Sequence, residues 1–356
     1  MKQLIKKYIN IAGYDIVKSD AVQEISTSHL VHRNPYYPNH GILDTSIGSK
    51  NLGDFIIMDA INFELHKLFN NQAYFTTFPT HLRVEKSDRE LLLEKEYLFV
   101  CGTNLLNSRM DLDHQWNVRK EDWNYFYKRC VLMGTGWSKY DTEPTKGTKE
   151  MLKRILSDKV LHSVRDEYSK NMLNSIGINN VVNTCCPTTW KIDIDRNNAQ
   201  KKELVVTTIT DYHQDIEKDT WMLNHLLATY NEVHIWIQSI EDIGYLEQMV
   251  LENKSRLKFI APSLNAYKEF LESNSSRIDY IGTRLHAGIF AMQRNVRSLI
   301  IGIDNRALEI AKDVKLNVIK RENIEDIDIF IRNPQANQLV LPYESIEKWK
   351  KSILGR

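Results

Sequence analysis

The sequence has few cysteines and no long hydrophobic run, and each shortage excludes a class of protein. Its 356 residues include four cysteines without a CxxC pair: Cys101, Cys130, Cys185 and Cys186. That pattern fits neither a zinc knuckle nor a disulfide framework. We therefore expect a reduced, cytoplasmic protein whose thiols are small hydrophobic residues on buried strands. The longest wholly apolar stretches reach about six residues, as around 298–303, whereas a membrane span needs about 20.

An excess of charge of one sign is also lacking. The chain has 47 Lys and Arg residues against 46 Asp and Glu residues, a formal net charge of +1. A broad nucleic-acid surface usually needs a basic excess, so no nucleic-acid partner is expected. An anionic small molecule needs only a few local cations and stays compatible. The N-terminus reaches Lys6 and Lys7 too early for a secretory signal to follow.

Familiar catalytic and metal-binding motifs are missing as well. The sequence contains no Walker A pattern and no GxSxG elbow. Two groups of potential metal ligands occur, but the first has no second ligand group at a matching spacing and the second is irregularly spaced. We therefore expect no metal. These groups are Asp111, Asp113 and His114, which fit a solvated loop, and His29, His32 and His40.

Hydrophobic periodicity is clearest in the second half of the chain. From Glu203 onward, short apolar runs rich in β-branched residues alternate with helical patterns of about ten residues. This alternation predicts βαβ units and a parallel sheet that is covered on both faces. The predicted strands are 204–208, 233–237, 257–260, 278–282, 299–303 and 316–319, and the predicted helices are 220–230, 240–252, 265–272, 286–293, 307–314 and 324–331.

The first half shows the same alternation less regularly. A strand at 42–47 precedes a long amphipathic helix at 52–69, and further strands are predicted at 97–101, 131–134, 161–164 and 181–184. A polar stretch at 193–202 predicts two domains, residues 1–195 on the acceptor side and residues 200–341 on the donor side of an active site. The predicted fold is α/β and GT-B-like, with two Rossmann-like, doubly wound domains facing a cleft. Periodicity alone fits other paired doubly wound domains equally well.

The C-terminal segment, residues 342–356, is predicted to form an amphipathic helix. Ile346, Trp349 and Ile353 fall on one face, and lysines occupy the other. Such a helix either packs back onto the protein or lies on a membrane surface.

The strongest local signal is the segment 279–288, DYIGTRLHAG. A strand is predicted to end near Gly282 and a helix to begin near Leu285, which places Arg284 and His286 at a strand-to-helix turn. Ligands of open α/β sheets bind outside the carboxyl ends of the strands, and a helix N-terminus attracts anions. Arg284 can grip a phosphate or carboxylate, and His286 can exchange a proton. A surface arginine and a capping histidine are the structural alternative.

A second turn of the same kind contains Arg165 and Asp166, in the segment HSVRD at 162–166. Arg165 sits at the same kind of edge as Arg284 and can contact substrate, whereas Asp166 fits the first turn of a helix electrostatically. A third turn, 46–54, contains Asn51, Gly53 and Asp54 and is not a GxGxxG motif. Asp54 can act as a general base for a hydroxyl group or simply cap its helix. The turn with Gly102 and Asn104 is predicted to lie on the same edge.

Taken in order, these segments resemble the polysaccharide pyruvyl transferase family. The matching elements are Asn51-Leu-Gly53-Asp54, the Gly102 loop, Ser163-Val-Arg165-Asp166 with Ser169, and Arg284-Leu-His286-Ala287. The chain departs from the family in the loop 101–104, where relatives often have consecutive glycines. It also has Arg306, in Asp304-Asn305-Arg306, where the family usually has lysine. The resemblance covers roughly residues 40–320.

The resemblance implies an enzyme of bacterial surface polysaccharide biosynthesis. Such enzymes transfer the pyruvyl group of phosphoenolpyruvate, as a ketal, to two hydroxyls of a sugar or of its lipid-linked precursor. On this reading His286 is the general acid, and Arg165, Arg284 and Arg306 join it in holding the donor. Asp54 deprotonates or orients the acceptor, and Asn51, Gly53, Gly102 and Asn104 line the cleft. No cofactor is implied, the location is cytoplasmic or peripheral at the inner membrane face, and the oligomeric state is open.

Two other functions fit the same residues. A nucleotide-sugar glycosyltransferase of polysaccharide assembly would use Arg284 and His286 to bind a diphosphate, and a non-catalytic saccharide-binding protein would use the cleft without turnover. Acceptor specificity is expected to lie in two loops of the first domain, 28–40 and 108–123, whose aromatic residues can stack on sugar faces or pack the loops onto the protein.

Overall fold

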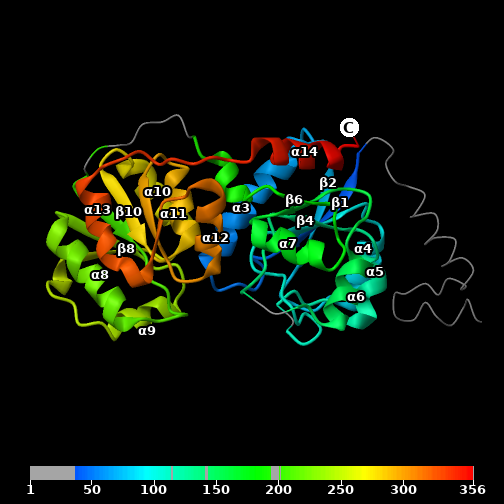
Figure 1. Ribbon diagram of the computed structural model, residues 1–356, viewed down its shortest axis with the longest axis horizontal. Coiled ribbons are helices and arrows are strands. Elements are labelled where there is room, and N and C mark those ends of the chain that lie inside the picture. Colours follow the sequence, from blue (N-terminus) through cyan, green and yellow to red (C-terminus); the bar gives the residue numbers. More distant parts are fainter. Residues whose placement is uncertain (1–36, 114, 141–142, 194–199, 201, 356) are drawn as a thin grey trace, which may run out of the picture.

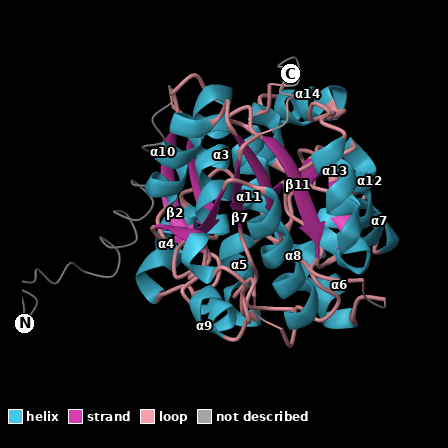
Figure 2. Ribbon diagram, turned by 90° about the vertical axis from the view of Figure 1, so that its left-hand side faces the viewer, coloured by secondary structure: helices cyan, strands magenta, loops and turns pink. Residues whose placement is uncertain are grey.

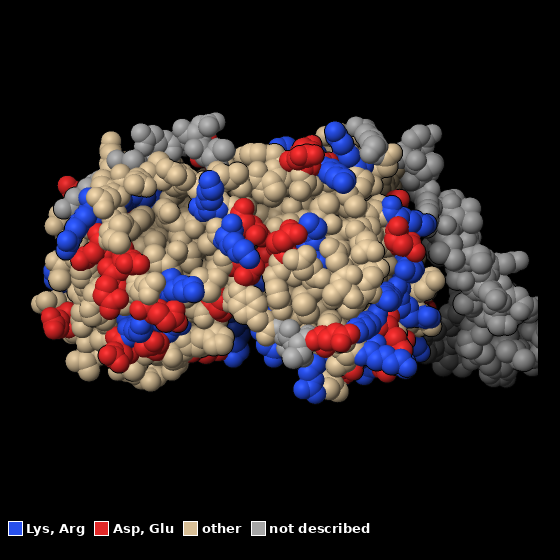
Figure 3. All heavy atoms as spheres, in the orientation of Figure 1, with Lys and Arg blue, Asp and Glu red and all other residues tan. Residues whose placement is uncertain are grey.

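The computed structural model describes residues 37–113, 115–140, 143–193, 200 and 202–355. Within this part the chain forms two α/β halves that lie next to each other along the longest axis of the molecule (Figure 1). Helices flank the strands on both sides (Figure 2). On the face drawn in Figure 3, acidic and basic side chains are interspersed, in keeping with the net charge of +1.

The second half contains a six-stranded parallel sheet in the order β12-β11-β10-β7-β8-β9. The order reverses between β7 and β10, which is the point where open α/β sheets bind ligands. The register pairs Tyr280 with Val206 and Ile281 with Leu299. The strands are β7 (Leu204–Thr207), β8 (Glu232–Trp236), β9 (Leu257–Ile260), β10 (Ile278–Gly282), β11 (Arg297–Gly302) and β12 (Val318–Lys320).

Two hydrophobic clusters cover the two faces of this sheet, because successive side chains of a strand point to opposite sides. Val206 and Tyr280 belong to one cluster, and Val205 and Ile281 belong to the other. All four are fully buried, which explains why the strands are continuous apolar runs. The helices of this half are α8 (Ile216–Thr229), α9 (Glu241–Glu247), α10 (Leu264–Asn274), α11 (Leu285–Met292), α12 (Asn305–Val314) and α13 (Ile327–Arg332).

The first half has a four-stranded parallel sheet in the order β2-β1-β3-β4. The parallel pair β5-β6 continues from its β4 edge, because Gly134 N donates to Ser163 O at 3.0 Å. The strands are β1 (Asn39–Asp44), β2 (Tyr74–Pro79), β3 (Leu98–Cys101), β4 (Cys130–Met133), β5 (His162–Val164) and β6 (Val181–Asn183). The helices are α3 (Leu52–Leu68), α4 (Lys86–Leu93), α5 (Trp123–Phe126), α6 (Lys146–Ile155) and α7 (Glu167–Ser175).

Periodicity did not predict β2, α4 or α6. β2 is an edge strand that buries little more than Phe78, and α4 buries only Leu92, so neither has a long apolar pattern. Cys101 and Cys130 lie on buried strands as predicted. The same prediction is wrong for Cys185 and Cys186, which lie in the buried turn between β6 and the short helix η2 (Pro187–Lys191).

The C-terminal helix α14 (Tyr343–Ile353) crosses back to the first half of the chain, where it lies near β6 (Figure 1). Its apolar face is buried through Ile346, Trp349 and Ile353. Ser352 Oγ accepts a hydrogen bond from Leu161 N at 3.1 Å. The protein itself therefore covers the face that a membrane-surface helix would use. No helix in the described ranges combines the length and apolarity that a bilayer crossing requires.

The structure tests part of the prediction that aromatic residues of the loops 28–40 and 108–123 contact a saccharide. Residues 28–36 and His114 lie outside the described residues. His40 belongs to β1 and is buried among Phe69, Phe75, Tyr97 and Phe99, and Trp116 is also buried, so neither ring is presented to a saccharide. Within the described ranges, no cluster of three acidic, histidine or cysteine ligands has the geometry of a metal site.

Candidate active site

A polar pocket lies where the strand ends of the second half meet the N-terminus of α3 from the first half. It encloses about 310 Å³ of empty space, counting its opening. The switch point between β7 and β10 borders it, as expected for an open α/β sheet. Its lining residues are Asn51, Tyr212, Gln238, Thr283, Arg284, Leu285, His286, Ile303, Asp304, Arg306 and Ala307. Four of the residues predicted from sequence, Asn51, Arg284, His286 and Arg306, thus share one pocket.

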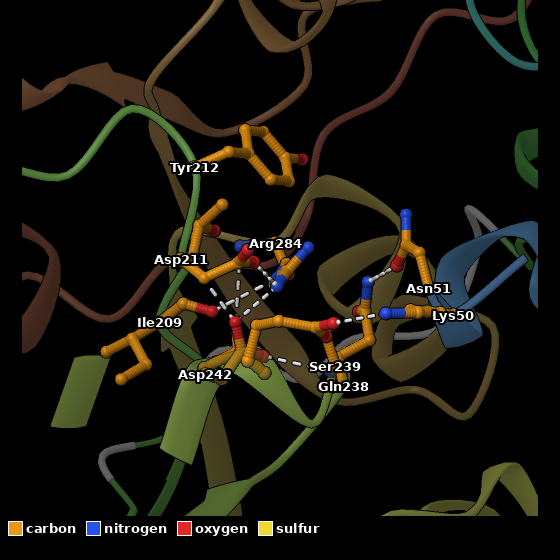
Figure 4. Close-up of polar contacts among 12 residues, drawn as sticks. Lys50, Asn51, Ile209, Asp211, Tyr212, Gln238, Ser239, Asp242 and Arg284 are labelled. Atoms are coloured by element: carbon orange, nitrogen blue, oxygen red, sulfur yellow. Dashed lines mark hydrogen bonds and ion pairs between the residues drawn. The ribbon is translucent and has the colours of Figure 1, made fainter. Parts of the chain in front are cut away.

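Arg284 is the N-cap residue of α11 and is almost completely buried. Its Nε donates to Ile209 O at 3.0 Å, and its Nη2 donates to the carboxylates of Asp211, at 2.8 Å, and Asp242 (Figure 4). Nη1 is buried and has no hydrogen-bond partner among the described residues. The carboxylates hold the guanidinium rigidly and leave one cationic N–H edge unused. That edge is suited to an anion.

His286 lies in the first turn of α11 and is also buried. Burial, together with the positive charges of Arg306 and Arg165, lowers the pKa of His286 to about 3. The imidazole is therefore neutral at physiological pH in the ligand-free protein. Its Nε2 lies 3.8 Å from Cys186 Sγ, a residue of the first half.

Arg165 follows β5 in the first half and is buried next to the predicted residue Asn104. Its Nη2 donates to Asn104 Oδ1, its Nε donates to Asp166 at 3.1 Å, and Nη1 has no partner within the described ranges. Gly136 packs directly on the guanidinium, because a Cβ at this position would lie 2.2 Å from the guanidinium carbon. Arg165 acts electrostatically on His286 and Asp304, so a cation of the first half approaches the pocket of the second.

Arg306 lies in the first turn of α12 and is held by two pocket residues. Its Nε donates to Asp304 at 2.9 Å, and its Nη2 donates to the hydroxyl of Tyr212 at 2.5 Å. These hydrogen bonds hold the Arg306 side chain in place as part of the pocket lining.

The start of α3 brings the remaining predicted residues close to this pocket. Asn51 Oδ1 accepts from Gly53 N at 3.0 Å, which caps the helix, and a Cβ on Gly53 would collide with Gln238. Gly102 does not line the pocket. It lies beneath α3, where its left-handed φ of +54° and its contact with Ile57 both require glycine.

Asp54 is buried in the first turn of α3 and interacts electrostatically with Arg306, but it is not one of the residues that line the pocket. Burial raises the pKa of Asp54, whereas a hydrogen bond from Ser49 Oγ at 2.6 Å and the positive charge of Arg306 oppose that rise. A carboxylate held in this way can accept a proton or orient a hydroxyl group. His81, which also lies near Asp54, has its Nδ1 2.9 Å from the carbonyl oxygen of Gln115.

Several residues that line the pocket or contact its lining were not predicted from the sequence. Asp211 and Tyr212 follow β7, and Gln238 follows β8. These are positions after parallel strands, so the rule that selected Arg284 would have selected them too. Asp242 lies in the first turn of α9 after β8, and Cys186 follows β6, so both also occupy positions after parallel strands. Only the packing shows that they meet Arg284 and His286.

Comparisons with known proteins agree with this architecture. The Staphylococcus aureus MnaA–UDP co-structure is 12% identical, with a TM-score of 0.51 over 90% of this chain and 97% of that one. UDP-GlcNAc 2-epimerase of Methanocaldococcus jannaschii, in complex with UDP-GlcNAc and UDP, is 13% identical, with a TM-score of 0.51 over 89% and 98%. These likenesses show the fold alone, and they confirm the predicted GT-B-like α/β architecture with parallel sheets.

Sequence comparison also finds a distant partial match to one component of the nuclease SbcCD of Staphylococcus epidermidis. The two sequences are 24% identical over 208 residues, which are 57% of this chain. The match spans only 19% of the length of that protein.

A family model described as polysaccharide pyruvyl transferase matches residues 51–305. This range begins at the α3 cap and ends at α12, and it includes Arg165, Arg284 and His286. The chain therefore belongs to the polysaccharide pyruvyl transferase family.

Proposed function

We propose that this protein transfers the pyruvyl group of phosphoenolpyruvate to two hydroxyls of a saccharide, with formation of a ketal and release of phosphate. The acceptor is a sugar of a bacterial surface polysaccharide or its lipid-linked precursor. The observation that carries the proposal is the pair of buried, unpartnered guanidinium nitrogens, Arg165 Nη1 and Arg284 Nη1, one from each half.

The three arginines offer hydrogen bonds to this donor, and each also pairs with at least one carboxylate, namely Asp166, Asp211 with Asp242, and Asp304. Phosphoenolpyruvate carries a phosphate and a carboxylate on three adjacent carbons, and both groups form strong hydrogen bonds with guanidinium. Arg306 and Arg165 lie close enough to lower the pKa of His286, Arg284 lines the same pocket as His286, and the N-terminus of α11 adds free N–H groups with a partial positive charge. The pocket is small, and most of its lining residues are polar or charged.

The reaction needs proton transfer at two places. Protonation of the methylene carbon makes the central carbon electrophilic, and the first acceptor hydroxyl adds there and loses its proton. The C–O bond to phosphate then breaks, and the second hydroxyl adds and loses its proton. Of the two hydroxyl protons, one is balanced by the new methyl group and one by the released phosphate.

His286 and Asp54 are the proposed proton carriers. His286 is neutral in the ligand-free protein, and the negative charges of a bound donor would offset the two arginines that lower its pKa. The imidazolium that then forms would deliver its proton to the methylene carbon. Asp54, which accepts a hydrogen bond from Ser49 at the start of α3, would receive a hydroxyl proton on the acceptor side. A positioned acid or base contributes about 10²–10⁴-fold to the rate.

The test has a donor arm and a turnover arm. Isothermal titration with phosphoenolpyruvate measures binding without any acceptor, and UDP and UDP-GlcNAc serve as competing ligands. The turnover arm adds candidate saccharide acceptors and monitors released phosphate and a product heavier by one pyruvyl ketal. Turnover with a nucleotide sugar alone would favour a glycosyltransferase. A lack of donor binding, together with an unaltered Arg284→Ala variant, would favour a non-catalytic saccharide-binding protein.

A further inference from the structure

His286 is the only histidine among the described residues that line the pocket, and its two ring nitrogens have different surroundings. Because the ring is neutral, only one of these nitrogens carries a hydrogen, and the surroundings decide which one. Nε2 faces the sulfur of Cys186 at 3.8 Å. Nδ1 has no hydrogen bond to any described residue, and the ring lines the donor pocket. The position of the hydrogen therefore decides whether the His286 ring offers the pocket a hydrogen-bond donor or a hydrogen-bond acceptor.

Thr188 determines the orientation of the Cys186 thiol. Its hydroxyl donates to Cys186 Sγ at 3.1 Å, and its backbone N–H is directed at the same sulfur. Both residues are fully buried. The sulfur thus already accepts from two donors, and its own single hydrogen has one remaining acceptor nearby, Nε2 of His286.

The opposite arrangement is unfavourable. If Nε2 carried the hydrogen, the sulfur would accept three hydrogens and the S–H of Cys186 would be buried without an acceptor. Protonation of both nitrogens is opposed by the positive charges of Arg165 and Arg306. The remaining state has an unprotonated Nε2 and a protonated Nδ1, on a ring that lines the pocket.

The backbone holds the two partners in register across the two halves. Cys186 precedes Pro187 at the start of η2, and Cys185 before it has a left-handed φ of +59°. At the far end of α11, Gln293 Nε2 donates to Thr188 O at 2.5 Å. Helix α11 is therefore tied to this turn at both of its ends, which limits rotation of the His286 ring away from Cys186.

We propose that Cys186 is a positioning residue that keeps His286 as its Nδ1–H tautomer, with that hydrogen directed into the donor pocket. The inference rests on the proposed function for its catalytic consequence, but not for the tautomer itself. In the proposed reaction, this tautomer presents an N–H to the donor and excludes the tautomer that presents only a lone pair.

The tautomer can be measured without substrate. Two-bond ¹H–¹⁵N correlation spectra of protein labelled with ¹⁵N-histidine distinguish a protonated from an unprotonated ring nitrogen, and the His286→Gln variant identifies the His286 signals. We expect a protonated Nδ1 and an unprotonated Nε2 at pH 7. A protonated Nε2 would overturn the proposal. If the expected tautomer is found but phosphoenolpyruvate is not a substrate, the proposed function fails and the positioning role of Cys186 stands.

Variants test the consequence for turnover. Cys186→Ala should give a mixture of His286 tautomers and lower kcat about 10-fold, within the range of general acid catalysis, while KM for the donor changes less than about twofold. Cys185→Ala is the matched control, because it removes a buried thiol from the adjacent residue, and it should leave tautomer and kcat unchanged. Thr188→Val, which frees the sulfur to accept from His286, should shift the tautomer in the same direction as Cys186→Ala. Equal losses in Cys185→Ala and Cys186→Ala would show a merely structural role and contradict the proposal.

Discussion

Asn51 Oδ1 accepts a hydrogen bond from Gln238 Nε2 at 2.6 Å, which joins the first turn of α3 to the end of β8 across the two halves (Figure 4). The same oxygen caps α3 through Gly53 N. The Asn51 side chain therefore caps α3, forms a hydrogen bond between the two halves and lines the donor pocket.

This relationship allows the capping role of Asn51 to be separated from its place in the pocket. Asn51→Ala should lower the free energy of unfolding by about 1 kcal/mol, because it removes a helix cap. Asn51→Asp keeps both hydrogen bonds but adds a negative charge to an anion-binding pocket. It should keep the stability and raise the Kd for phosphoenolpyruvate. Equal donor binding by Asn51→Asp and the native protein would show that the anion lies elsewhere. Thermal unfolding and calorimetric titration measure the two effects.

Arg165 should contribute to donor affinity through its planar guanidinium. In Arg165→Lys, the Kd for phosphoenolpyruvate should rise about 10–100-fold, since a hydrogen bond to a charged group contributes about 1.5–3 kcal/mol. Arg256→Lys is the matched control, because Arg256 also donates to several carbonyls but lies outside the pocket. Titration calorimetry should find the native Kd in Arg256→Lys. An unchanged Kd in Arg165→Lys would count against this donor site.

Arg284 is expected to stabilise the fold as well as the ligand. Arg284→Met should cost about 3–5 kcal/mol of stability, because Asp211 and Asp242 lose their common counter-charge. The double variant Arg284→Met/Asp242→Asn should recover part of that loss while donor binding stays impaired. Chemical denaturation and donor titration of both variants test this. Recovery of donor binding in the double variant would show that Arg284 acts only through folding.

The lowered pKa of His286 predicts how the reaction rate depends on pH. Because its pKa in the free protein is about 3, kcat/KM should show no titration of His286 near its usual value of 6.5. His286→Asn should lower kcat about 10²–10⁴-fold and leave the pH dependence of kcat/KM between pH 5 and 8 unchanged. A fall in kcat/KM centred near pH 6.5 that disappears in His286→Asn would contradict the neutral resting state.

His40 predicts a loss of stability in mild acid. Burial lowers the pKa of His40 to about 4, and neither ring nitrogen has a partner among the described residues. Between pH 6.5 and 4 the unfolded chain binds more protons than the folded one, so stability present above pH 6.5 is lost as the pH falls. His40→Phe should reduce that loss by up to about 3 kcal/mol in denaturant titrations at pH 7 and 4. The exposed His66→Gln is the control, and an unchanged acid sensitivity in His40→Phe would contradict the assignment.

Much of the fold follows from local sequence patterns. The strands of the second half were predicted within about two residues, because buried parallel strands are continuous apolar runs bounded by turns. The edge strand β2 and the polar helix α4 escaped prediction, because each buries few side chains. The long helix α3 was predicted closely, with Asn51 directly before it.

The candidate site was predicted to a similar extent. A strand-to-helix turn places Arg284, His286 and Arg165 at sheet edges whatever the rest of the chain does. The ionisation of His286 was not predictable, because it depends on burial and on two arginines that are distant in sequence. The two carboxylates that hold Arg284 follow β7 and β8, where the rule for strand ends could have found them, but their contacts with Arg284 depend on the packing.

The sequence by itself determined the class of fold, the absence of a charge excess and the residue types at the edges of the parallel sheets, because these depend on local periodicity and composition. Only the tertiary structure decided that Cys186 meets His286, that Asn51 meets Gln238 and that α14 buries its apolar face on the first half. The first two contacts join residues 100 and 187 positions apart, and the third brings the end of the chain back to its first half. Their existence depends on how two separately patterned halves pack together, and local sequence carries no information about that packing.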